Sequence, residues 1–268
     1  ADIDADGRLD LIESVDTSTI AGPSRLLWNR TEPGALVPTF EPAEGRWDVG
    51  THGMGLAVGD LDQDGLLDMY NTSRGQDILV MGNASGGFDD QTVARGILHE
   101  WASLGLRVQW SPSIVDLDCG GRLDLLVRHG LPSTFSTMIV SAWAADLLYL
   151  QGADGMFERA PVPSEDGDGE GKHFAVGDIE GDGRPDVGLD GLSSDVHVWH
   201  NVSNVPETTA RLTVRFKPTV SAMPPTGAVV IGTCGGLTHT RHLTSGGKIG
   251  GRESPELHFA WPDCADEA

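Results

Sequence analysis

An acidic pattern recurs four times in this sequence, and its residue types are those that bind a hard metal ion. The full pattern is Asp-x-Asp-x-Asp-Gly-x-x-Asp, with acids at positions 1, 3, 5 and 9 and glycine at position 6. Glycine permits the positive φ of a sharp turn, so the first three acids lie on one side of a short loop. Oxygen ligands at this spacing suit Ca²⁺, which accepts about six to eight oxygens, better than the strictly octahedral Mg²⁺. The predicted metal ligands are Asp2, Asp4, Asp6, Asp10, Asp60, Asp62, Asp64, Asp68, Asp178, Glu180, Asp182 and Asp186.

The third copy of the pattern lacks one acid. Residues 116–124 read Asp-Leu-Asp-Cys-Gly-Gly-Arg-Leu-Asp, so Gly120 stands where the other copies have the acid at position 5. We therefore expect a weaker calcium site there, formed by Asp116, Asp118 and Asp124. A solvated acidic turn is the alternative for any single copy, but four copies in register favour calcium.

The copies are spaced like the units of a repeat architecture. They begin at residues 2, 60, 116 and 178, which are 58, 56 and 62 residues apart. Short β-prone runs such as Leu56–Val58 and Phe174–Val176 precede the loops, and others such as Leu125–Val127 follow them. These runs are too short for helices and are bounded by Gly, Asp and Asn, which indicates strands. Several strands in a period of about 60 residues match the size of a propeller blade, so the sequence predicts an all-β protein.

The overall charge excludes two classes of partner. The chain has 268 residues, with 40 acidic and 18 basic side chains and a net charge of −22. Nucleic acids and anionic membrane surfaces both attract clustered Lys and Arg, so we expect neither as a partner. No apolar run approaches the roughly 18 residues of a membrane span. The hydrophobic fraction of 39% is enough for a normal core.

Cysteines and asparagines bear on the compartment. The three cysteines form no Cys-x-x-Cys pair, which argues against a thiolate zinc site. Two interpretations stay open: a disulfide between Cys234 and Cys264 that leaves Cys119 free, or three free thiols. Four of the five asparagines open an Asn-x-Ser/Thr glycosylation sequon, which favours a secreted or cell-surface protein. The candidate acceptors are Asn29, Asn71, Asn83 and Asn201, although asparagine is also a common turn residue.

The acidic loops between strands, together with a Gly-x-Phe turn at Gly155–Phe157, resemble FG-GAP/VCBS repeats. The resemblance is strongest in residues 53–65, which read Gly-Met-Gly-Leu-Ala-Val-Gly-Asp-Leu-Asp-Gln-Asp-Gly and are similar to the cartilage acidic protein 1 group. The resemblance implies blades of a calcium-bearing β-propeller like that of integrin α chains. Such propellers usually have more blades than the four loops found here. We therefore expect a partial or truncated propeller, or one completed by another subunit.

The C-terminal part resembles the ASPIC/UnbV domain, which follows the propeller in that same group. Runs such as Arg211–Phe216 and Thr226–Ile231 alternate apolar and polar residues, which independently indicates a small β domain. Phe259-Ala-Trp-Pro stands where the family usually has Phe-Gly-Leu-Gly. The predicted organisation is a propeller part at 1–205, an ASPIC/UnbV-like domain at 206–262 and an acidic tail at 263–268.

The remaining polar clusters do not indicate catalysis. The sequence lacks His-Glu-x-x-His, Gly-x-Ser-x-Gly and P-loop motifs. His99–Glu100 and the acidic run 165–170 are the other polar clusters, and the run is better explained as a solvated loop, although it could extend calcium binding near Asp178. Three C-terminal histidines could cluster, but scattered histidines on strands are more often surface residues. They are His239, His242 and His258.

These observations predict a non-catalytic, calcium-binding extracellular scaffold or adhesion protein that contacts a protein partner in the matrix or at the cell surface. A lectin-like carbohydrate-binding propeller is the alternative, and it would need an exposed Trp or Tyr beside Asp or Asn. A calcium-dependent polysaccharide lyase or hydrolase ranks last, because the chain has three lysines and no paired base. All three functions share calcium dependence.

Overall fold

The protein is built from β-strands. The computed structural model describes residues 1–16, 22–43, 53–97, 108–130, 146–162, 171–191, 196–217, 226–245, 247–248, 251–252 and 254–264. Every regular element in these residues is a strand, which confirms the predicted all-β class. Within the same residues, no helix is long and apolar enough to cross a membrane.

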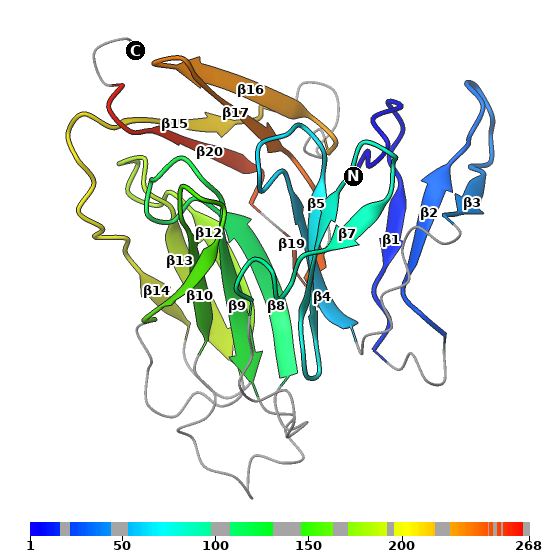
Figure 1. The fold of residues 1–268 in the computed structure, drawn as a ribbon, viewed down its shortest axis with the longest axis horizontal. Helices are drawn as coiled ribbons and strands as arrows, with labels where there is room; N and C mark the ends of the chain where they lie inside the picture. The colour runs from blue at the N-terminus through cyan, green and yellow to red at the C-terminus, as the bar shows by residue number, and fades with distance from the viewer. Residues whose placement is uncertain are drawn as a thin grey trace, which may run out of the picture.

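Four small antiparallel sheets follow one another along the chain like the blades of a propeller (Figure 1). Blade 1 contains β1 (Leu11–Glu13), β2 (Arg25–Asn29) and β3 (Phe40–Pro42). Blade 2 contains β4 (Gly53–Gly59), β5 (Asp68–Ser73), β6 (Ile78–Gly82) and β7 (Phe88–Asp90). Blade 3 contains β8 (Val108–Val115), β9 (Asp124–Gly130), β10 (Leu147–Gln151) and β11 (Phe157–Ala160). Blade 4 contains β12 (Gly171–Gly177), β13 (Asp186–Gly191) and β14 (His197–Trp199).

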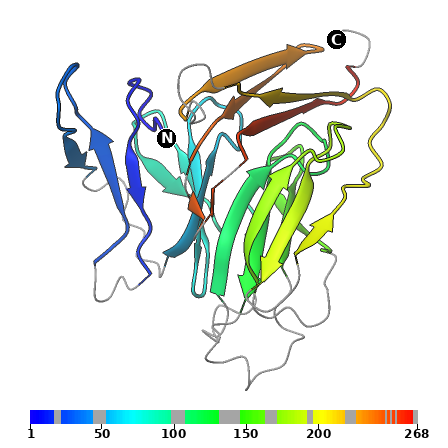
Figure 2. The ribbon, with the colours of Figure 1, turned by 180° about the vertical axis from the view of Figure 1, so that it is seen from behind.

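The blades form an open arc. Blades 1 and 4 stand at opposite ends of the row in both views, and no closed ring is seen in the described part of the chain (Figures 1 and 2). Within each blade, every strand pairs with its neighbours in sequence. The acidic loops occupy residues 2–10, 60–68, 116–124 and 178–186, and we call them loops 1 to 4. Loops 2 to 4 each join the first two strands of a blade.

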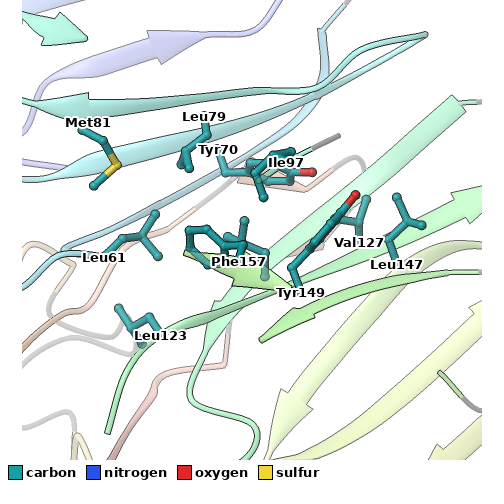
Figure 3. Close-up of a cluster of buried hydrophobic side chains, with 11 residues drawn as sticks. Leu61, Tyr70, Leu79, Met81, Ile97, Leu123, Val127, Leu147, Tyr149 and Phe157 are labelled. Carbon is teal, nitrogen blue, oxygen red and sulfur yellow. The ribbon is translucent and has the colours of Figure 1, made fainter. Parts of the chain in front are cut away.

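Apolar side chains between neighbouring blades form the core. The largest cluster lies between blades 2 and 3, where Tyr70 and Leu79 face Tyr149 and Phe157 (Figure 3). Tyr70 and Leu79 are fully buried. Burying such a side chain contributes roughly 1.5–3 kcal/mol, so packing between blades, more than the short sheets themselves, stabilises the arc. Similar clusters join blades 1 and 2 around Leu26 and blades 3 and 4.

The C-terminal part is a separate group of paired strands. Its pairs are β15 (Ala210–Arg215) with β20 (Glu256–Trp261), β16 (Val229–Cys234) with β17 (Leu237–His242), and β18 (Gly247–Lys248) with β19 (Gly251–Arg252). A disulfide joins Cys234 to Cys264, and Cys119 is free and buried. Cys264, placed in an acidic tail by the sequence, is buried and belongs to this unit.

This C-terminal unit lies across one end of the blades. In both views the strand pairs β15–β20 and β16–β17 run over the end where the acidic loops emerge (Figures 1 and 2). The short strand β18 packs against β4 and β8, the first strands of blades 2 and 3. The unit therefore contacts both the loops and the inner strands of the arc.

Candidate metal centres

The four loops share one turn geometry. Position 6 is a glycine with positive φ in each loop: Gly7 at 86°, Gly65 at 88°, Gly121 at 86° and Gly183 at 81°. Position 4 also has positive φ in each loop: Ala5 at 56°, Gln63 at 65°, Cys119 at 58° and Gly181 at 76°. A positive φ is uncommon outside glycine, so its recurrence at three non-glycine residues shows how strongly the turn is imposed. The loops therefore curl alike despite their different sequences.

In loops 1 to 3 this turn brings three carboxylates together. In each group the ligand atoms lie within 4.8 Å of one another, and the groups are Asp2, Asp4 and Asp6; Asp60, Asp62 and Asp68; and Asp116, Asp118 and Asp124. Loop 3 therefore gathers three acids although Gly120 replaces its fourth. Two predicted ligands, Asp10 and Asp64, lie outside these groups. The exposed Asp64 accepts the N–H of Leu66 at 2.8 Å.

Several oxygens in these groups are buried without a hydrogen-bond partner. They are Oδ1 of Asp4, Asp60, Asp62 and Asp116. A buried carboxylate oxygen without a partner is costly, because it loses its hydration and gains nothing in return. A cation bound among the three carboxylates would compensate for that loss. The donor set of loops 1 to 3, all hard oxygens, fits Ca²⁺.

Burial also raises the affinity of these carboxylates for protons. Desolvation raises the pKa of Asp60 to about 6 and that of Asp116 to about 7. Backbone hydrogen bonds oppose the shift of Asp60, and the Arg241 guanidinium followed by backbone hydrogen bonds opposes that of Asp116. Desolvation likewise raises the pKa of Asp68 to about 8, and neighbouring carboxylates add to it. The buried negative charge therefore needs a positive charge in the same place, which either a proton or a metal ion supplies.

The acids at position 9 have a structural role that the sequence did not indicate. Each accepts two backbone N–H bonds, one from position 2 of its own loop and one from the end of a later strand in the same blade. For Asp10 the donors are Ile3 and Asn29, each at 2.8 Å. The other pairs are Leu61 and Gly82 for Asp68, Leu117 and Gln151 for Asp124, and Ile179 and Asn201 for Asp186. These acids tie each loop to its blade.

Loop 4 is arranged differently. Asp178 accepts the N–H groups of Gly181, Asp182 and Gly183, and these bonds lower its pKa although burial alone would raise it. The group gathered here is Glu180, Asp186 and His200, so the predicted ligands Asp178 and Asp182 lie outside it. His200 Nδ1 lies 3.1 Å from Glu180 Oε1. Sequence reasoning missed His200, whose only signal is its place beside Asn201.

Arginines partly neutralise loops 1 and 2. Arg30 Nη1 lies 2.9 Å from Asp4 Oδ2 and 2.9 Å from Asp6 Oδ2, and Arg95 Nη2 lies 2.9 Å from Asp62 Oδ2. These contacts use the second oxygen of Asp4 and Asp62. The oxygens without a partner are Oδ1 in each case, and they stay buried.

The C-terminal unit binds backbone carbonyls of loops 3 and 4. Arg241 Nη2 donates to Gly121 O at 3.1 Å, and this arginine is buried. Arg211 Nε donates to Asp182 O at 3.2 Å, and Arg215 Nη2 donates to Asp178 O at 3.1 Å. The conformation of the loops therefore affects how the C-terminal unit docks.

The sequon asparagines are largely structural. Asn71 is fully buried in β5, and its Oδ1 accepts a bond from Ser14 Oγ, so the fold leaves no room for a glycan there. Asn29 Nδ2 donates to Leu9 O at 3.0 Å, and Asn201 Nδ2 donates to both Leu117 O and Pro185 O. The side-chain amides of Asn29 and Asn201 therefore bond to backbone carbonyls of the loops, and Asn71 lies in a buried strand and not in a turn. The half-buried Asn83 donates from Nδ2 only to the exposed Asp89.

The other candidate clusters bring no site together in the described residues. His239 stacks on Trp261, and desolvation lowers its pKa to about 4. No metal-binding group in the described residues contains His239, His242 or His258. His99–Glu100 and the acidic run 165–170 lie outside the described residues. Trp28, Trp199 and Trp261 pack in hydrophobic clusters.

Comparison with known proteins bears on the N-terminal part. The FG-GAP-like repeat matches residues 2–71. This range begins at loop 1 and ends in β5, so it covers loops 1 and 2 together with blade 1. A search of curated proteins finds no match. The match supports the blade interpretation of the sheets and the acidic loops, which are typical of the calcium loops of such repeats.

Proposed function

We propose that this chain is a non-catalytic extracellular scaffold whose propeller blades are rigidified by Ca²⁺ and contact a protein partner. The observation that carries the proposal is the grouping of three carboxylates in each of loops 1 to 3, with buried oxygens that lack a partner. Metal binding would remove this cost and fix the loops. The net charge of −22 makes cations the natural ligands.

Calcium bound in the loops would organise the surface on which the C-terminal unit docks. Its arginines bond to carbonyls of loops 3 and 4, so ordered loops give it a fixed docking surface. This unit is the part that resembles the ASPIC/UnbV domain, and its place on the loops supports one function for both parts. The disulfide supports an extracellular location, because disulfides persist in oxidising compartments.

In the described residues, no observation favours the lectin-like or the polysaccharide-acting alternative. Tyr70 and Tyr149 are buried, and Trp28 and Trp261 pack in cores, so none of these rings offers an open face for a sugar. Lys172 lies over the ring of Trp110 with its Nζ 4.7 Å from the ring centre, a contact that occupies that ring.

Calcium stoichiometry tests the metal part of the proposal. Metal-free protein is titrated with Ca²⁺ and its mass is measured under native conditions. We expect one ion in each of loops 1 to 3, and Asp62→Asn should lose one of them. Glu158→Gln, which removes the same charge at an exposed position of β11, should lose none. Absence of bound calcium would overturn the metal assignment.

Isolation of the native protein tests the scaffold part. Protein purified in the presence of Ca²⁺ should co-purify with stoichiometric amounts of partner subunits, and EGTA should release these subunits. A free monomer of about 28.4 kDa under the same conditions would overturn the scaffold proposal and leave calcium binding untouched.

A further inference from the structure

Loop 3 lacks a hydrogen bond that fixes the turn in the other three loops. In loops 1, 2 and 4 the acid at position 5 accepts the N–H of position 7 through its Oδ1. These bonds run from Arg8 to Asp6 at 2.9 Å, from Leu66 to Asp64 at 2.8 Å and from Arg184 to Asp182 at 2.9 Å. Each bond holds the planar peptide unit that joins positions 6 and 7. In loop 3, position 5 is Gly120, which has no side chain to accept the N–H of Arg122.

In loop 3 the same peptide unit is held by its other end. Gln63 Nε2 donates to Gly121 O at 3.0 Å, and Arg241 Nη2 donates to the same oxygen at 3.1 Å. A carbonyl oxygen has two lone pairs, so these two donors saturate it. Gln63 stands at position 4 of loop 2, 58 residues earlier in the chain. Its bond therefore crosses from one loop to the next and fixes from outside the unit that an acid fixes locally in the other loops.

The surroundings of this peptide unit make such bonds necessary. Gly121 is buried, whereas the matching Gly7 and Gly65 are exposed. The C-terminal unit closes over it, because a Cβ on Gly121 would lie 3.0 Å from both Ala260 O and His239 Nε2. Buried carbonyls are nearly always hydrogen-bonded, because losing water without a replacement is costly. The two donors therefore satisfy the Gly121 carbonyl and hold the loop at the same time.

The held peptide unit borders the carboxylates of loop 3. Gly121 N–H donates to Asp116 Oδ2 at 2.9 Å. Asp116 is 2% exposed, and its Oδ1 has no partner. Gly120 and Gly121 are adjacent, and glycine is the residue with the greatest backbone freedom, so this turn is the one that local sequence fixes least. Holding Gly121 O restricts that freedom and lowers the cost of gathering the carboxylates around an ion.

We propose that Gln63 is a positioning residue for Ca²⁺ binding in loop 3, although it belongs to loop 2. It supplies no ligand and acts through Gly121 O, where it replaces the acid that position 5 of loop 3 lacks. The loop 3 site is therefore formed by blades 2 and 3 together. This inference rests on the proposed calcium binding and adds to that site a residue from outside its own loop.

Gln63→Ala removes the bond without altering the turn of loop 2. Loop 1 already has Ala5 at the same position, with φ of 56° against 65° for Gln63. The amides of Gly65 and Gly121 each donate to the position 1 acid of their own loop, so their NMR shifts report calcium binding in loops 2 and 3 separately. Titration of the ¹⁵N-labelled, metal-free chain with Ca²⁺ gives one midpoint for each amide.

We expect Gln63→Ala to raise the calcium midpoint at Gly121 about three- to tenfold, the change that corresponds to one hydrogen bond, and to leave the midpoint at Gly65 within about twofold. The matched control is Gln76→Ala, which removes a side-chain amide bond to Asp77 O of 2.9 Å and should change neither midpoint. A bond that only stabilises the fold would lower Tm in EGTA and leave both midpoints unchanged, and this result would overturn the positioning role.

Gly120→Asp supplies a rescue, because it restores the acid that accepts the position 7 N–H in the other loops. A Cβ at Gly120 meets only the exposed side chain of Asp118, which can move. In this background Gln63→Ala should change the Gly121 midpoint less than twofold, and an equal weakening with and without Gly120→Asp would overturn the replacement. If calcium leaves the Gly121 amide of the unaltered chain unshifted, the metal assignment of loop 3 fails as well. A shift with equal midpoints in the unaltered chain and in Gln63→Ala overturns the positioning role alone.

Discussion

Replacing Asp60 by asparagine should stabilise the metal-free protein and leave the stability of the calcium-loaded protein nearly unchanged. Asp60 is 1% exposed, and its Oδ1 has no hydrogen-bond partner. In metal-free protein its charge is buried beside the carboxyl groups of Asp62 and Asp68. The neutral amide of the substituted side chain removes that charge and can donate to these neighbouring carboxylates. The variant should therefore be more stable than the unaltered chain in EGTA.

The magnitude follows from the cost of the buried charge. Desolvation raises the pKa of Asp60 from 3.8 to about 6. Each pKa unit corresponds to about 1.4 kcal/mol, so the charged form costs on the order of 3 kcal/mol at neutral pH. A ligand at 100 times its Kd adds about 2.7 kcal/mol, and the variant loses this gain at loop 2. The two effects are similar in size and opposite in sign.

Thermal unfolding at pH 7.5 in EGTA and in excess Ca²⁺ measures both effects. A change of 1 kcal/mol shifts Tm by roughly 2–4 °C in a domain of about 150–250 residues. Asp60→Asn should therefore raise Tm by several degrees in EGTA and change it little in excess Ca²⁺, where the two effects nearly cancel. Glu158→Gln, which makes the same charge change at an exposed site, should change neither value. An equal loss of Tm in both buffers would show that Asp60 acts only through its bond to Gly65 N–H, and would refute the reasoning.

Three further changes test other parts of the structure. Gln151→Asn should stabilise blade 3 by about 1–2 kcal/mol, because both polar atoms of the Gln151 side chain are buried without partners. At the matching position of blades 1 and 4, Asn29 and Asn201 donate hydrogen bonds to their loops. Chemical denaturation measures the gain in the free energy of unfolding. Changing Cys234 and Cys264 together to Ser opens a loop of sequence separation 30 and should cost roughly 3–4 kcal/mol, with a dithiol lowering Tm only in the unaltered chain. The folded pKa of His239, about 4, lies below its ordinary value of 6.5, so its neutral form stabilises the fold above pH 6.5 and that contribution is lost as the pH falls toward 4. His239→Leu should flatten the fall of Tm over this pH range, and an unchanged slope would show that other groups cause it.

The sequence by itself determined the features that depend on neighbouring residues. The loops curl because glycine stands at position 6, and the strands begin and end where short β-prone runs meet Gly, Asp and Asn. Both depend on local spacing, so four copies of the pattern were enough to predict an all-β chain with blades. The grouping of carboxylates in loops 1 to 3 is local as well, since each group falls within nine residues.

Only the tertiary structure decided what those local units contact. Arg241 reaches Gly121 from 120 residues away, and Asn201 reaches Leu117 from 84 residues away. Packing between blades buries Asn71, which looked like a glycan acceptor, and the folding of the C-terminal unit brings Cys264 to Cys234. Pairing of β14 with β13 places His200 beside Glu180. Such contacts depend on how whole sheets pack, and no spacing along the chain encodes them.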